Sequence, residues 1–172
     1  MAKQLVFLDA NVIIEAFRIG VWPELAAGWQ LETVEKCVEE ALTGDSCRAD
    51  RVAVDGAQLV SGLHQVHEAG RPMRNKLIAE YPDCATLDAG EKDLFAYLNT
   101  KRPLPALILI STADKAAIVR ARQLGWLDHL TSLEELLRKT TATSIKVAEL
   151  GQQHTLKFLS RVRTDALLGR IP

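Results

Sequence analysis

Residues 5–11 read LVFLDAN, a short apolar run that ends in an acid and an amide. Residues 106–114 read ALILISTAD and repeat this order, with apolar residues before Ser, Thr and Asp. Uninterrupted apolar runs of this length, bounded by polar residues, are typical of parallel strands buried on both faces. A stretch that can form a helix follows each run. The sequence therefore predicts an α/β fold, in which helices flank a central parallel sheet.

The remaining elements fit the same plan. Residues 88–91 have the spacing of a capping box, which places Asp93 in the first turn of a helix. Residues 43–81 carry the weakest pattern. The periodicity predicts strands at 31–34, 51–54 and 126–130, and helices at 35–42, 58–68, 114–124 and 132–139.

Length and composition limit the class of protein. The chain has 172 residues, of which 48% are hydrophobic and 25% charged, as in one globular domain. We expect residues 1–140 to form that domain and residues 141–172 to form a linker and a C-terminal helical extension. The first apolar run is too short for a signal peptide or a membrane span, so we expect a cytoplasmic protein without a membrane partner. Three cysteines without a C-x-x-C pair favour free thiols.

Charge is unevenly distributed along the chain. Residues 1–100 carry 9 Lys and Arg against 16 Asp and Glu, whereas residues 101–172 carry 12 against 6. An acidic half can bind cations and a basic half can attract phosphates. This asymmetry suits a protein that binds both cations and phosphates, and solvated surfaces produce such differences too.

Two acids follow the two predicted strands directly. Asp9 and Asp114 should lie at the carboxyl edge of the sheet, where α/β domains bind ligands. Two unit charges about 4 Å apart repel by roughly 4 kcal/mol at an effective dielectric near 20, so such acids need a counter-ion. Oxygen ligands without a nearby His or Cys favour Mg²⁺ or Mn²⁺. Either acid alone would be interpreted as a helix cap or a surface charge; the equivalent placement of both favours a site.

Four motifs resemble those of PIN-domain nucleases. They are FLDANVII at residues 7–14, VEEAL at 38–42, GEKDLFA at 90–96 and ISTAD at 110–114. They occur in the order that the family has, and the resemblance spans residues 4–139. It implies a three-layer PIN-like fold with a carboxylate-bound Mg²⁺ or Mn²⁺. By position, the implied metal ligands are Asp9, Glu40, Asp93 and Asp114, with Asn11 and Thr112 orienting a carboxylate or a water.

Two of these assignments stay open. Glu39 competes with Glu40, and Glu91 competes with Asp93. Glu40 is preferred because it precedes an apolar residue as the family's second acid does. Asp93 is preferred because the apolar residues 94–96 follow it, as in the family.

The resemblance implies metal-dependent hydrolysis of single-stranded RNA. Such an enzyme could be the toxin of a toxin-antitoxin pair, with a protein antitoxin as partner, or an RNA-processing enzyme. The alternative is a PIN-like module that binds RNA or protein without cutting, although a scaffold has no need of four repelling acids. A phosphatase of the haloacid-dehalogenase type would need a second Asp at the position of Asn11.

The C-terminal segment lies beyond the resemblance. Phe158, Val162 and Ala166 recur every four residues and form an apolar stripe on a predicted helix. We expect this stripe to pack on its own domain, and the alternative is that it buries against a second copy in a homodimer.

Overall fold

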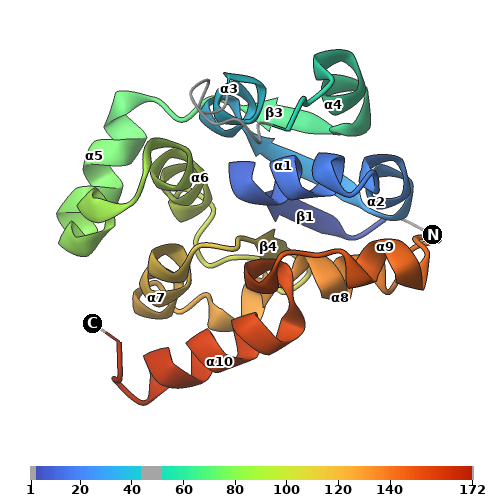
Figure 1. Cartoon of the computed structure of the whole chain (residues 1–172). Helices are drawn as coiled ribbons and strands as arrows, with labels where there is room; N and C mark the ends of the chain where they lie inside the picture. Colours follow the sequence, from blue (N-terminus) through green and yellow to red (C-terminus); the bar gives the residue numbers. More distant parts are fainter. Residues whose placement is uncertain (1–2, 44–51, 172) are drawn as a thin grey trace.

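The computed structural model of the chain describes residues 3–43 and 52–171. In this part five parallel strands form one sheet in the order β3-β2-β1-β4-β5 (Figure 1). The predicted fold class is confirmed, because helices cover both faces of a central parallel sheet. The strands are β1 (Leu5–Leu8), β2 (Gln30–Val34), β3 (Gln65–His67), β4 (Leu109–Ser111) and β5 (Leu130–Thr131).

Ten α-helices and three short 3-10 turns connect or follow these strands in the described residues. The helices are α1 (Ala10–Arg18), α2 (Trp22–Gly28), α3 (Glu35–Thr43), α4 (Gly56–Gly62), α5 (Arg71–Glu80), α6 (Ala89–Asn99), α7 (Lys115–Gln123), α8 (Leu133–Leu137), α9 (Ser144–Ala148) and α10 (Leu156–Leu167). The 3-10 turns are η1 (Pro82–Thr86), η2 (Leu127–His129) and η3 (Gln152–His154).

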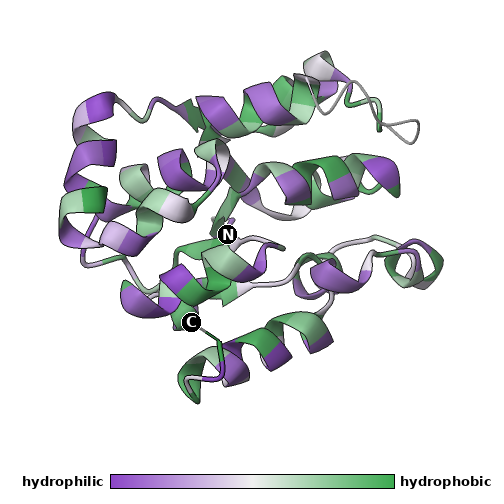
Figure 2. Ribbon diagram, turned by 60° about the vertical axis from the view of Figure 1, so that its left-hand side comes forward, coloured by the Kyte–Doolittle hydropathy of each residue, from purple (hydrophilic) through white to green (hydrophobic). Residues whose placement is uncertain are grey.

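The sheet separates two hydrophobic cores. Successive strand residues point to opposite faces, so Phe7 of β1 enters one core while Val6 and Leu8 enter the other. The Phe7 core is closed by α6, α7 and α10, and the second core by α1, α2, α4 and α8. In Figure 2 the strands at the centre are green, that is apolar, and polar residues lie on the outer turns of the helices.

Two sequence expectations are wrong between residues 52 and 68. Residues 52–54 form no strand, and position 51 lies outside the described residues. The helix expected at 58–68 is α4, which ends at Gly62 and is followed by strand β3. The indole Nε1 of Trp22 donates to the carbonyl of Gln58 at 3.0 Å, and its ring lies where a Cβ on residue 62 would stand. Tertiary packing against Trp22 thus accompanies the end of this helix.

The last strand is also shorter than expected. Residues 127–129 form the turn η2, and only Leu130 and Thr131 pair with β4. Gly125 adopts a φ of 75° after α7, a conformation that other residues rarely take. This turn directs Trp126 into the core, where its ring packs edge-on against the ring of Phe95 with the two ring centroids 5.4 Å apart.

The C-terminal helix packs on its own chain. Leu159, Val162 and Ala166 of α10 are buried, and α10 lies along α7. This placement agrees with the expected stripe, shifted so that Leu159 rather than the half-buried Phe158 occupies its first position. None of the helices in the described ranges is long and apolar enough to cross a membrane.

We expect Leu159→Ala to lower the free energy of unfolding by about 2–5 kcal/mol, because the change leaves a cavity between α10 and α7. Leu159 is 2% exposed. Urea denaturation would measure the effect. Ser160→Ala, an exposed position on the same helix, is the matched control and should change stability by less than about 0.5 kcal/mol. Equal stability of the two variants would contradict a structural role for α10.

Candidate active site

Asp9 stands where β1 ends and α1 begins. Its side chain is 1% exposed, and Oδ1 accepts a hydrogen bond from the amide of Ala10 at 2.7 Å. Burial, together with the negative charges of Asp88 and Glu40, raises the pKa of Asp9 to about 7. Asp9 is thus a buried acid in a negative environment, and it gains or loses its proton near neutral pH.

Asp114 comes to the same edge because β4 lies beside β1. Leu8 pairs with Ser111, and the amide of Asp9 donates to the carbonyl of Ser111 at 3.0 Å. Asp114 caps α7, accepting from the amides of Ala116 and Ala117 at 2.6 and 3.1 Å. Neighbouring strands therefore bring the two strand-end acids together.

Thr112 connects these two acids. Its hydroxyl donates to Oδ2 of Asp9 at 3.2 Å and accepts from the amide of Asp114, also at 3.2 Å. The hydroxyl has one proton to donate, and Asp9 receives it. This contact fixes the orientation of the Asp9 carboxylate.

Glu91 faces the two strand-end acids from the first turn of α6. It is 2% exposed, and its Oε1 is buried without a hydrogen-bond partner in the described residues. Burial, together with the negative charges of Asp9, Asp114 and Asp88, raises the pKa of Glu91 to about 9. Its backbone amide donates to Asp88, but Glu91 completes no capping box there. The side chain is instead directed into the acidic cluster.

Asp93 lies on the opposite side of α6, since residues two positions apart on a helix do not share a face. Both of its carboxylate oxygens accept from Nη1 of Arg74, at 2.9 Å each. Asp93 and Arg74, together with Lys36 and Glu39, line a separate pocket of about 270 Å³. The structure therefore does not bring Asp93 to Asp9 and Asp114, and the α6 acid that faces them is Glu91.

Glu40 reaches the cluster from α3. Its Oε1 accepts from the amide of Gly90 at 3.0 Å. Burial raises the pKa of Glu40, and the neighbouring charge of Asp88 contributes. A Cβ on residue 90 would collide with the Glu40 carboxylate and would lie 3.1 Å from the sulfur of Cys37. The competing Glu39 points outward and pairs with Lys36 at 3.0 Å, so Glu40 is the α3 acid on the site side.

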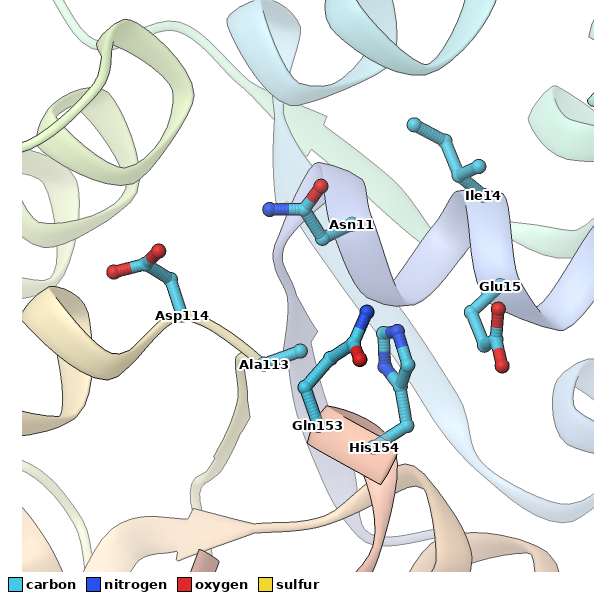
Figure 3. Close-up of a pocket in the computed structure, with 7 residues that line it drawn as sticks. All are labelled: Asn11, Ile14, Glu15, Ala113, Asp114, Gln153 and His154. Atoms are coloured by element: carbon cyan, nitrogen blue, oxygen red, sulfur yellow. The ribbon is translucent and has the colours of Figure 1, made fainter. Parts of the chain in front are cut away.

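Asn11 and Asp114 line a pocket of about 350 Å³ beside this cluster (Figure 3). Asn11 is exposed on the first turn of α1, and its amide points toward the open space between α1 and Asp114. The remaining wall comes from the C-terminal segment, through Gln153 and His154. The sequence offered no signal for this contribution, because it depends on where the last 30 or so residues fold back.

Of the four acids, Glu40 is influenced by the nearby positive charge of Lys36. Among the described residues no Lys or Arg forms an ion pair with Asp9, Glu91 or Asp114, whereas Asp93 pairs with Arg74. In the same residues, no three His, Cys, Asp or Glu side chains are arranged so that they could hold a metal ion. The arrangement can bind protons as it stands, and its unpaired oxygens are hard donors suited to a divalent cation.

We expect Glu91→Gln to stabilise the metal-free protein by more than about 1 kcal/mol at pH 8, because at that pH the buried Glu91 carboxyl must take up a proton on folding and the neutral amide need not. The folded pKa of about 9 lies above the ordinary value of 4.5. The folded state therefore binds the Glu91 proton more tightly than the unfolded state does. The gain in the free energy of unfolding of the variant over the parent should be small at pH 4.5 and grow as the pH rises toward 9. Denaturation in chelator at pH 5 and pH 8 would measure it, with the exposed Glu39→Gln as control. A variant less stable than the parent at pH 8 would contradict the argument.

Compared with models of known protein families and with curated proteins, the chain gave no match. The resemblance to PIN-domain nucleases thus rests on the four motifs alone. What the geometry adds is the meeting of Asp9, Glu40, Glu91 and Asp114 at the carboxyl edge of a parallel sheet.

Proposed function

We propose that this chain is a divalent-metal-dependent ribonuclease whose acids are Asp9, Glu40, Glu91 and Asp114. The proposal keeps three of the acids that the resemblance implies and takes Glu91 in place of Asp93. The observation that carries it is the burial of Glu91 with an unpaired oxygen, facing Asp9 and Asp114. Isolated buried carboxylates are costly, so such a group is typical of a functional site.

A cation would remove the cost that these acids impose on the fold. In the described residues no basic side chain forms an ion pair with Asp9 or Glu91, and burial together with nearby negative charges raises the pKa of both carboxyls. A divalent ion held by Asp9, Glu91 and Asp114 would favour the charged forms instead. Because no three ligands are yet arranged around one point, binding requires side-chain rotation, with Glu91 the least constrained of the three.

The protein's own groups have defined tasks in this proposal. Thr112 holds the Asp9 carboxylate through its hydroxyl, and the amide of Gly90 holds Glu40. Asn11 stands at the mouth of the site, where it can contact a substrate. When bound, a divalent cation lowers the pKa of a water molecule and stabilises the charge on the leaving oxygen of a phosphodiester.

Single-stranded RNA is the substrate that we propose for this nuclease. Residues 101–172 carry 12 Lys and Arg against 6 Asp and Glu, and such a net positive charge can attract the phosphates of RNA. Toxin activity, a protein antitoxin and a homodimer remain predictions. A small adjacent gene encoding a DNA-binding antitoxin would support the toxin role.

One observation favours a second candidate, an RNA- or protein-binding module without catalysis. Within residues 3–43 and 52–171 the acids form no ready three-ligand group, as a scaffold that had lost its metal would show. The two candidates differ in their response to metal, which the next experiment measures.

We expect the protein to cleave single-stranded RNA in Mg²⁺ or Mn²⁺ and to stop in excess chelator. Hydrolysis by water leaves a 5′-phosphate and a 3′-hydroxyl, since no 2′-hydroxyl attack is involved. Gel analysis of end-labelled RNA with phosphatase treatment would identify the ends. Cyclic phosphate products, or equal turnover in chelator, would contradict the mechanism. RNA binding without cleavage at any metal concentration would support the scaffold.

The choice between the two α6 acids can be tested by a matched pair of variants. Glu91→Gln should reduce the cleavage rate about a hundredfold or more, because it removes a proposed ligand. Asp93→Asn should stay within about fivefold of the parent, since Asp93 is paired with Arg74 outside the cluster. Single-turnover cleavage at saturating Mn²⁺ would measure both, with thermal unfolding as the control for folding. The reverse order of effects would restore Asp93 as the ligand.

A further inference from the structure

The pocket beside the acid cluster is built from three distant parts of the chain. Figure 3 shows residues of α1, of the turn before α7 and of the C-terminal turn η3 around one space. The lining residues are Asn11, Ile14, Glu15, Ala113, Asp114, Gln153 and His154. Asp114 belongs both to this pocket and to the acid cluster, so a group bound here would lie directly beside the proposed reaction site.

Two acids, the buried Glu15 and the partly buried Glu134, hold the C-terminal wall in place. Oε1 of Glu15 accepts from the amide of Gly151 at 2.6 Å, and Oε2 of Glu134 accepts from the amide of Leu156 at 2.8 Å. These bonds hold the chain on both sides of η3. Arg18 donates two hydrogen bonds of 2.7 Å to the Glu15 carboxylate. The guanidinium charge of Arg18 is therefore neutralised by Glu15. The position of η3 over α1 is thus set by specific hydrogen bonds.

His154 is the unusual member of the lining. It is 4% exposed, yet its Nδ1 is buried without a hydrogen-bond partner in the described residues. Burial lowers the pKa of His154, so its ring is neutral at pH 7 and offers one donor and one acceptor. In Figure 3 the ring stands beside the amide of Gln153, and both project toward Asn11.

We propose that this pocket is a subsite for one base of single-stranded RNA, contacted by His154 and Gln153 next to Asp114. The inference rests on the proposed nuclease function and adds a base-recognition role for the C-terminal extension. Unpaired RNA bases bind by stacking on flat rings, His included, and by hydrogen bonds to their edges. The pocket offers the side-chain amides of Asn11 and Gln153 for hydrogen bonds and the small exposed part of the His154 ring for contact.

The charges of the pocket favour a base over a phosphate. Its charged members are Glu15 and Asp114, both acidic, while Arg18 is held by Glu15. A phosphate would be repelled here, whereas a neutral base would not. The volume of about 350 Å³ lies at the lower end of ordinary ligand pockets, as a single base requires.

Nucleotide binding tests the subsite without relying on cleavage. The full chain, labelled with ¹⁵N and kept in chelator, would be titrated with each of the four ribonucleoside 5′-monophosphates and followed by NMR. We expect the ring nitrogens of His154 and the side-chain amide of Gln153 to shift with at least one nucleotide. His154→Leu, similar in size without ring nitrogens, and Gln153→Ala should each weaken that binding about tenfold, as loss of a base contact does. Gln152→Ala, exposed in the same turn and outside the pocket lining, should bind as the parent does.

Cleavage preference separates this inference from the proposed function. Mg²⁺-dependent cleavage of an RNA library randomised around the cut should show a base preference that His154→Leu and Gln153→Ala flatten and Gln152→Ala keeps. Parent-like preference in both variants would overturn the subsite and leave the nuclease intact. Nucleotide shifts at His154 with no cleavage in metal would support the subsite and overturn the nuclease. Nucleotide shifts confined to other residues, or none at millimolar nucleotide, would overturn the subsite. Because Gln153 is exposed, Gln153→Ala keeps the test valid if His154→Leu fails to fold.

Discussion

The parallel pairing of β1 with β4 is the constraint on which the site depends. One hydrogen bond, from the amide of Asp9 to the carbonyl of Ser111, fixes the level at which both strands end. The next residues on each side are then Asp9 and the segment from Thr112 to Asp114. Helices α3 and α6 contribute Glu40 and Glu91 to this edge. A slip of one residue in this register would turn Asp9 toward a different face of the sheet.

The fold was largely predictable because its central strands are buried on both faces. The run 5–8 lies in the middle of a sheet covered by helices, as its composition predicts. The second apolar run enters the sheet only at Leu109, and Leu107, which was expected in the same strand, is 74% exposed in the preceding turn. Where segments are only partly buried, the sequence pattern did not distinguish strand from helix. The short edge strand β3 was interpreted as helix, since residues 65–67 alternate too briefly to reveal a strand, and the packing of Trp22 against α4 connects residues about 40 positions apart.

The site was predictable in part, for reasons that individual residues make clear. Asp9 and Asp114 follow strands, so their position came directly from the hydrophobic pattern. On α6 the helical periodicity favoured Glu91 as the acid facing the site, whereas the motif comparison led to the choice of Asp93. Glu91, Leu94, Phe95 and Leu98 recur at the spacing of one helix face, and all are buried. Asp93 falls outside that stripe. The wall formed by His154 had no local signal, because its contacts come from Glu15 and Glu134, far away in the chain.

The close approach of α3 to α6 has a consequence for sequence drift. Gly90 leaves no room for a methyl group, because the carboxylate of Glu40 occupies that space, and its amide is the donor that holds this carboxylate. Position 90 is therefore closed to variation for as long as Glu40 keeps its place. Glu91 is the next residue in the same first turn of α6. A Gly-Glu pair at the start of this helix should accordingly be inherited as a unit, and in a search for distant relatives that pair carries more information than an acid alone.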